Sequence, residues 1–513
     1  MTTRKGRQAR NRLRANRIIL ALLVLVVIGA LYGLLGLIKP VALTSAASVG
    51  SAGRLTVTDA LLGCPAPGSA GTTGGGVAIA NVPAAAGTGQ ASLTRLNPDS
   101  TSTPISGVPR PGQLTVAKVK SSPAVPKGHD VTAKMAGGLV PTGPARGGLI
   151  ISATGANAQG LDVEQLGPGG QPTARCQPAG SDFWFVSPGA PSLHFYLYLM
   201  NTDSLQANAA VSVQTDSGPL LGPQDSGIIV PPHSMIMQNL DKLVHSAKAV
   251  ALHVTTSTGR VVAAVRVTNS AAKEGMWLPA AAPPSTNQVL TGLPSSPGLR
   301  ELYLTVPGGA AAQIKVTAIS PKGSYQPTGG SGLNLLEHQS AGISIPSLGG
   351  TVGSIMITSN VPVTGSLEMS GGPGGAPGTF VVGSGEIVGQ AVLAASTAGR
   401  VGATELVLAA PGGAASVSIG QAIPGAALTG LNGQIVHIPA KSAVEVKLTL
   451  PKRSDKATLI AIVVTPLTGS GPVYAGRVAI IRGAVQTVQP VVSSPARVEL
   501  SRVRQSQLAV LGS

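Results

Sequence analysis

The chain has few aromatic and few charged residues. Of its 513 residues, 4 are Phe, 6 are Tyr and 2 are Trp, and charged residues make up 11%. The aromatic and basic interleaving that stacks nucleic-acid bases is missing. The seven His residues are scattered and form no H-x-x-x-H or H-E-x-x-H pattern. We therefore expect no nucleic-acid partner, no metal site and no cofactor.

Acidic residues are also scarce, since Asp and Glu together number 19. A paired-carboxylate site would have to assemble from distant strands. Asp162 and Glu164 alternate on one strand face, and we expect both to point into solvent. Glu301 and Glu405 recur at equivalent positions, which indicates a structural role. No nucleophile-elbow motif is present, so we assign no catalytic residue and expect that the protein is not an enzyme.

The residues that do occur in quantity indicate an all-β protein. Hydrophobic residues make up 43%, mostly Val, Ala, Leu and Ile, beside 68 Gly and 41 Pro without a Gly-X-Y period. This composition excludes collagen and a wholly disordered chain. It is typical of short β-branched strands joined by small-residue turns.

The N-terminus predicts a single membrane crossing. Residues 1–17 carry seven basic groups and no acid, and residues 18–38 are an uncharged apolar stretch long enough to span a bilayer as a helix. The basic flank predicts a signal anchor with its N-terminus in the cytoplasm and the bulk of the chain outside. A cleaved signal peptide, ending near residues 44–48, is the alternative. Much of the net charge of +17 belongs to this flank.

A repeat of about 105 residues follows. Leu197, Leu302 and Leu406 begin similar apolar strands at steps of 105 and 104 residues. Each is followed by an alternating strand and then by a segment that ends in Pro; we align Ile229–Pro231, Ile343–Pro346 and Ile435–Pro439 as the same strand of three copies. A fourth, divergent copy lies upstream. Turn signals at short intervals favour antiparallel sandwiches.

The fold class predicted is therefore all-β, with about four tandem Ig-like antiparallel β-sandwich repeats after one transmembrane helix. A β-propeller-like closed array is the alternative. The predicted boundaries are a basic segment 1–17, a transmembrane helix 18–38, a linker 39–54, a divergent β-domain 55–175, sandwich repeats 176–275, 276–372 and 373–485, and a tail 486–513.

Two cysteines and two tryptophans stand out. Cys64 and Cys176 are separated by about one repeat, and outside the membrane a disulfide is the expected state of such a pair. Trp184 and Trp277 each precede an apolar strand of a repeat. We interpret both as aromatic anchors of the sandwich cores.

The chain resembles an actinobacterial family of membrane-anchored envelope proteins with repeated β-sandwich modules, catalogued as a domain of unknown function. The motifs that carry the resemblance are Trp184–Val186, Leu197–Asn201, Val230–Ser234, Gly259–Val265, Cys64-Pro65 and Gly155–Gln165. The later copies depart from it, with Pro307 and Pro411 in place of Asn. The resemblance implies the cell surface and carries over no catalytic residue.

These observations predict a non-enzymatic scaffold or binding module at the cell envelope. It would be attached to the membrane through residues 18–38 and would engage an envelope protein or a glycan. The alternative is a glycan-binding or glycan-processing accessory protein.

Overall fold

The computed structural model describes residues 54–64, 76–96, 102–105, 110–118, 148–166, 172–220, 227–244, 247–269, 272–295, 299–345, 348–370, 379–397, 403–431, 433–448, 458–481 and 484–499. Almost all of their regular structure is antiparallel β-strand, so the all-β prediction is confirmed. The helical elements in these ranges are the single turns η1 (Gly155–Asn157) and α2 (Asp241–Val244). No helix in them has the length and apolar character of a membrane span. The predicted span 18–38 lies outside the described residues.

The strands form four pairs of facing sheets, which we call the first to fourth sheet pairs. Alternation of apolar and polar residues places one face of each sheet against its partner. The first pair consists of the sheets β10-β2-β7-β4-β5 and β6-β3-β8-β9. Its strands are β2 (Asp59–Cys64), β3 (Gly76–Ala80), β4 (Ala91–Leu96), β5 (Ser102–Ile105), β6 (Thr115–Lys118), β7 (Leu149–Thr154), β8 (Asp162–Leu166), β9 (Pro172–Arg175) and β10 (Gln177–Pro178).

The second pair consists of the sheet β11-β17-β13-β14, to which β15 adds, and the sheet β16-β12-β18-β19. Its core includes Phe185, Phe195, Leu197 and Leu199, each at most 1% exposed. The strands are β11 (Asp182–Pro188), β12 (Leu193–Asn201), β13 (Ala207–Thr215), β14 (Gly218–Pro219), β15 (Ile228–Val230), β16 (Ser234–Asn239), β17 (Ala249–Thr258), β18 (Val262–Asn269) and β19 (Ala272–Leu278).

The third pair is joined by one long strand, β26 (Gly353–Ser370). Its first half pairs with β20 and β22, and its second half pairs with β21 and β27. The other strands are β20 (Ser285–Leu293), β21 (Leu299–Thr305), β22 (Ala312–Ser320), β23 (Gly323–Tyr325), β24 (Leu333–Leu335), β25 (Ser340–Ser344) and β27 (Thr379–Ser384). β27 lies beyond residue 372, the predicted end of this repeat.

The fourth pair consists of the sheets β28-β33-β30-β31 and β32-β29-β34-β35. Its core includes Leu393, Leu406, Leu408 and Ile462, all fully buried. The strands are β28 (Ala391–Thr397), β29 (Ala403–Ala410), β30 (Ala415–Ala422), β31 (Gln434–Ile438), β32 (Ser442–Lys447), β33 (Thr458–Pro466), β34 (Tyr474–Ile481) and β35 (Ala484–Val491).

One strand alignment made from the sequence is wrong. Ile229–Pro231 and Ile435–Pro439 belong to β15 and β31, which pair with the third strand of their sheet pairs, β13 and β30. Ile343–Pro346 begins in β25, which pairs with β21 instead. The strand of the third pair that corresponds to β15 and β31 is β24, which pairs with β22 and carries no proline.

A left-handed turn precedes the corresponding strand of each pair, which is β6, β16, β25 or β32. His233, His338 and Lys441 have φ angles of 47°, 57° and 56°, and Gly112 occupies the turn before β6 with φ 72°. Each of the three non-glycine residues donates its backbone N–H to a carbonyl group at or just after the end of the pair's second strand. The acceptors are Asp203 O for His233, Val306 O for His338 and Ala410 O for Lys441. The backbone thus has the same conformation at steps of about 105 residues.

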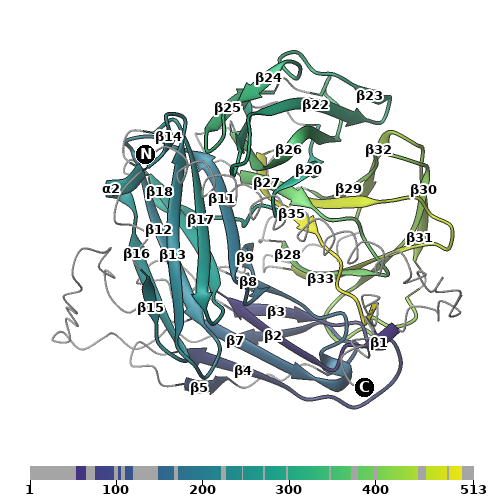
Figure 1. The fold of residues 1–513 in the computed structure, drawn as a ribbon. Coiled ribbons are helices and arrows are strands. Elements are labelled where there is room, and N and C mark those ends of the chain that lie inside the picture. The colour runs from purple at the N-terminus through teal and green to yellow at the C-terminus, as the bar shows by residue number, and fades with distance from the viewer. Residues whose placement is uncertain are drawn as a thin grey trace, which may run out of the picture. The chain divides into compact units, whose positions relative to one another are not determined.

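Neighbouring pairs contact each other through the outer faces of their sheets. Met200, Met235 and Val262 of the second pair meet Leu96 and Ile150 of the first. Trp184 and Val186 of the second pair meet Tyr303 and Val382 of the third. Val407, Val478 and Val488 of the fourth pair join the core cluster of the third. In Figure 1 the four pairs follow one another in colour along the chain, from purple and blue in the first pair through teal and green to yellow in the fourth.

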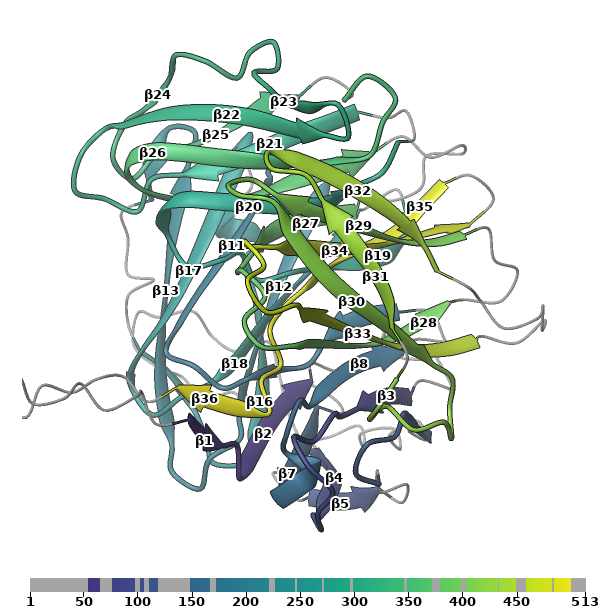
Figure 2. The same ribbon diagram turned by 90° about the vertical axis from the view of Figure 1, so that its right-hand side faces the viewer.

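The fourth pair also contacts the first, so the contacts close on themselves. Val392, Ala394 and Val463 pack against Ala78 and Ala80, and Figure 2 shows β33 and β28 beside β8 and β3. We call this contact the closing junction. It is the one junction among the described residues whose two sides do not follow each other in sequence. The first and last described strands pair as well: β1 (Arg54–Thr56) pairs with β36 (Arg497–Glu499), and Val57 donates its N–H to Ala496 O at 3.0 Å.

Candidate functional site

The predicted disulfide is present. Cys64 and Cys176 are bonded, with their Cα atoms 4.4 Å apart and a sequence separation of 112 residues. Both side chains are buried in the core of the first pair. Because Cys64 ends the first strand of this pair and Cys176 follows β9, the bond ties the beginning of the pair to its end.

The two tryptophans lie on outer sheet faces and not in the sandwich cores that they were expected to anchor. Trp184 is 4% exposed and sits between the second and third pairs, while its neighbour Phe185 enters the core. Trp184 stacks on His253 with ring centroids 3.9 Å apart, and His253 Nε2 lies 3.3 Å from Asp182 Oδ1. Burial lowers the pKa of His253, against the opposing charge of Asp182. Trp277 is half-buried and packs on Tyr198, which borders the cluster shared with the first pair.

The expectation that Asp162 and Glu164 point into solvent is wrong. They are 1% and 0% exposed because the fourth pair covers them. Asp162 pairs with Arg175 at 2.5 Å and accepts the N–H of Ala394, on β28, at 2.8 Å.

Glu164 enters a buried polar network of the closing junction. It accepts a hydrogen bond from Gln489, which in turn accepts one from Arg477. Arg477 Nη1 lies 3.9 Å from the Glu164 carboxylate and is fully buried. Burial lowers the pKa of Arg477, and the negative charge of Glu164 opposes this shift.

Two further carboxylate pairs lie on sheet faces. Glu301 and Glu368 are directly opposite on β21 and β26, and burial together with the charge of Glu301 raises the pKa of Glu368 to about 7. Burial raises the pKa of Glu405, and its neighbour Glu445 adds to the shift. Lys447 faces Glu405 across the ladder. Among the described residues, no group of three or more His, Cys, Asp or Glu is placed to hold a metal ion.

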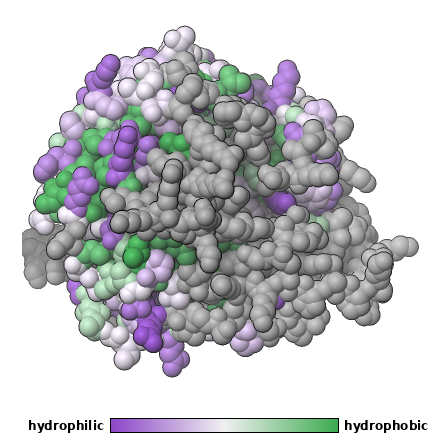
Figure 3. Space-filling model, turned by 180° about the vertical axis from the view of Figure 1, so that it is seen from behind, coloured by the Kyte–Doolittle hydropathy of each residue, from purple (hydrophilic) through white to green (hydrophobic). Residues whose placement is uncertain are grey.

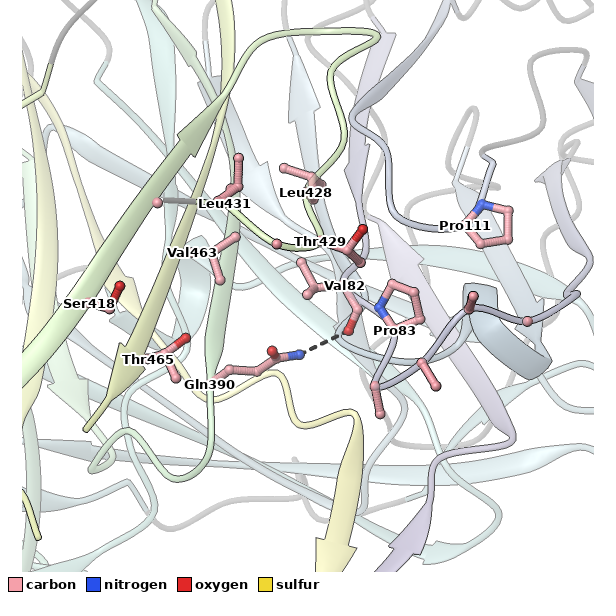
Figure 4. A pocket seen from close by; sticks show the side chains of 16 residues that line it. Val82, Pro83, Pro111, Gln390, Ser418, Leu428, Thr429, Leu431, Val463 and Thr465 are labelled. Carbon is pink, nitrogen blue, oxygen red and sulfur yellow. Dashed lines mark hydrogen bonds between the residues drawn. The ribbon is translucent and has the colours of Figure 1, made fainter. Parts of the chain in front are cut away.

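A cavity of about 590 Å³ lies at the closing junction. We call it the closing cavity. Figure 4 shows its two walls, one from the β3–β4 connection of the first pair and one from the sheet face of the fourth pair. The lining residues are Val82, Pro83, Ala84, Ala85, Ala86, Gly87, Pro111, Gln390, Ser418, Gly420, Leu428, Thr429, Gly430, Leu431, Val463 and Thr465.

Specific hydrogen bonds hold the two walls together. Gln390 donates its side-chain N–H to Val82 O at 3.0 Å, the contact drawn in Figure 4. Leu428 donates its backbone N–H to Gly112 O at 2.8 Å, and Gln113 forms a β-bridge with Ala427. The cavity therefore exists only while the first and fourth pairs are in contact.

The chemistry of the lining is neutral. None of the lining residues that the structure describes is charged; they combine hydroxyl and amide side chains with Pro, Leu, Val and Ala. Ser418 and Thr465 are directly opposite each other on β30 and β33. Such a lining offers hydrogen bonds and apolar contact without a charged partner.

A model of a family of unknown function (DUF5719) matches residues 128–449, which is more than half of the chain. The chain belongs to this family. The DUF5719 match includes the second and third pairs and the Ser418 strand β30, whereas Val82 and Thr465 lie outside it. No curated protein matches the chain in sequence.

Sequence reasoning missed the closing cavity. Its walls come from segments more than 300 residues apart, and Gln390 with Val82 is one such pair. The residues that line it are ordinary strand and turn residues, so they carry no motif. The sequence offered one indication, the alternative architecture of a closed array, in which the last repeat lies against the first.

Proposed function

We propose that the protein is a non-enzymatic binding module displayed outside the membrane, anchored through residues 18–38. The observation that carries the proposal is the buried Cys64–Cys176 disulfide in the first pair. In the sequence, this pair follows soon after the basic segment 1–17 and the apolar stretch 18–38. Disulfides persist in oxidising compartments, and the basic flank favours an N-terminus in the cytoplasm. The family resemblance supports a place in an actinobacterial envelope.

The same proposal extends to the architecture. The four sheet pairs would be four copies of one Ig-like sandwich repeat, arranged as a closed array. Support comes from the shared strand order and from the left-handed residues His233, His338 and Lys441 at equivalent positions. A closed array of sandwiches presents its loops from a rigid frame, which suits the capture of a partner.

Topology is the first test. Alkaline phosphatase, which is active only outside the cytoplasm, is fused after residue 513 of the full chain, and the redox state of Cys64 and Cys176 is measured by thiol alkylation in cells. We expect phosphatase activity and an oxidised pair. An inactive fusion with reduced cysteines would contradict the display proposal.

The binding role is tested by cross-linking in native membranes. The full-length protein and a form that lacks residues 1–40 are purified with their cross-linked neighbours, and mass spectrometry also determines the mature N-terminus. We expect one envelope protein or glycan to be retained by both forms. If the partner is retained by the full-length protein but not by the form that lacks residues 1–40, the four sheet pairs are not the binding element.

A further inference from the structure

We propose that the closing cavity binds a neutral saccharide through side-chain hydroxyls. The inference deepens the binding function proposed above, because it names a ligand class for one site. It stands on the lining of the cavity and on its place at the closing junction, not on the membrane topology.

The size of the cavity and its lack of charge define the class of ligand. A volume of about 590 Å³ lies within the range of sites for small organic molecules. A charged ligand would lose its hydration without gaining an ionic partner, since no lining residue that the structure describes is charged. A neutral ligand avoids this penalty.

Three hydroxyl groups in the lining are available for a ligand. Ser418, Thr429 and Thr465 make no side-chain hydrogen bond to any described part of the chain. Ser418 and Thr465 face each other across the β30–β33 ladder, and Figure 4 shows both side chains on the same wall. Each hydroxyl both donates and accepts, so it matches the hydroxyl groups of a sugar in either sense.

The backbone around Ser418 and Thr465 disfavours an extended peptide. β30 lies between β33 and β31, and β33 lies between β28 and β30, so both strands are interior to their sheet. Their N–H and C=O groups are engaged in the ladders and offer no free edge for strand addition. Recognition by β30 and β33 must therefore come from their side chains. Pro83, Leu428 and Leu431 provide apolar surface suited to the C–H faces of a sugar ring.

The position of the cavity couples binding to closure. A ligand that contacts both Val82–Gly87 and Ser418–Leu431 adds to the bonds from Gln390 and Leu428 across the junction. A ligand that binds only the closed form stabilises it by mass action. Saccharide binding is therefore expected to raise the unfolding temperature of the protein.

The test uses the full-length protein in detergent with a panel of neutral disaccharides: maltose, cellobiose, trehalose and α-1,6-mannobiose. Cellobiouronic acid serves as the charged counterpart and the peptide Ala-Pro-Ala-Gly as the neutral peptide. Saturation-transfer NMR and calorimetry measure binding. We expect at least one neutral disaccharide to bind, with cellobiouronic acid and the peptide at least tenfold weaker.

Matched variants locate the site. Thr465→Val and Ser418→Ala each remove one hydroxyl with little change of shape and should weaken saccharide binding about fivefold. Thr358→Val, on β26 of the third pair, is the control and should leave binding unchanged. Circular dichroism and the unfolding temperature show whether each variant is folded.

Several results would overturn the inference. These are no binding of any panel sugar to the folded protein, equal binding to the Thr465→Val and Ser418→Ala variants, or preferential binding of the peptide or of cellobiouronic acid. The phosphatase and thiol measurements do not depend on saccharide binding. Failure of the cavity proposal is therefore distinguishable from failure of the display proposal.

Discussion

Two glutamates directly opposite each other, Glu301 and Glu368, make the stability of the protein depend on pH. The folded pKa of Glu368 is about 7, raised by burial and by Glu301 above the ordinary value of 4.5. Between these two values the folded state binds more protons than the unfolded state. The linkage relation then requires stability to fall as the pH rises from about 5 to about 7.

The Glu368→Gln variant should remove this pH dependence. Because Gln carries no charge opposite Glu301, we expect the variant to be more stable than the parent protein by about 1–2 kcal/mol at pH 8, and to differ little at pH 5. Urea unfolding of the full-length protein at the two pH values measures both. The exposed Glu337→Gln serves as control. An equal effect of Glu368→Gln at pH 5 and pH 8 would contradict the assignment.

Lys441 offers a second residue-scale test, because an exposed L-residue with φ 56° is strained. Replacing it by Gly removes the Cβ atom that opposes this conformation. We expect Lys441→Gly to raise the unfolding midpoint, equivalent to about 0.5–1 kcal/mol. Lys315→Gly, within β22, should do the opposite because a strand interior disfavours Gly. A destabilised Lys441→Gly variant would show that the side chain, not the backbone, matters there.

At the scale of elements, the first pair depends on its disulfide. The bond closes a loop of 112 residues in a pair whose core cluster has few large side chains. Removing a link of this length costs up to about 5 kcal/mol on the chain-entropy model, and native disulfides typically contribute 2–5 kcal/mol.

We therefore expect the Cys64→Ala, Cys176→Ala double variant to lose about 2–4 kcal/mol of stability, with proteolysis beginning in the first pair. Limited proteolysis followed by mass spectrometry identifies the cut sites. Dithiothreitol should bring the parent protein to the level of the variant and leave the variant unaffected. Cuts that appear first in the second or third pair would contradict this view.

The sequence predicted where strands occur better than it predicted which strands correspond to each other in different repeats. Leu197, Leu302 and Leu406 all lie in second strands of their pairs, because alternation of apolar residues directly encodes a strand with one buried face. Proline did not mark one strand consistently, so Ile343–Pro346 was misaligned. The left-handed turns mark the repeat better, but the residues that occupy them, His233, His338 and Lys441, share no sequence motif.

At the scale of the whole ring, closure rests on groups that only the tertiary structure brings together. Glu164 and Gln489 are 325 residues apart, and neither belongs to a motif. The sequence predicted that Glu164 points into solvent. Alternation shows which residues lie on the inner and outer faces of a strand, but it does not show which other part of the chain covers the outer face. A second sheet pair covers that face here.

Glu164→Ala should therefore open the closing junction. It leaves the buried Arg477 without its acidic neighbour, and loss of one partner of a buried pair typically costs 3–5 kcal/mol. Spin labels on Ala85→Cys and Thr429→Cys, on opposite walls of the closing cavity, report the separation by pulsed EPR. We expect a longer and broader distance distribution. Asp203→Ala, which breaks the exposed pair with Arg260, is the control and should change neither distance nor stability by much.

The pairing of β1 with β36 has a consequence for the order of synthesis. The ribosome completes the first sheet pair long before it makes β28, β33 and β36, so the small-residue face of Ala78 and Ala80 has no cover during most of translation. Closure must be among the last folding events, and a chain truncated before residue 391 leaves that face open. A nascent protein of this kind needs protection from aggregation until closure. A circular permutant that begins at β28 would cover the face of Ala78 and Ala80 early in translation and would leave the contact of Val407, Val478 and Val488 with the third pair to form last.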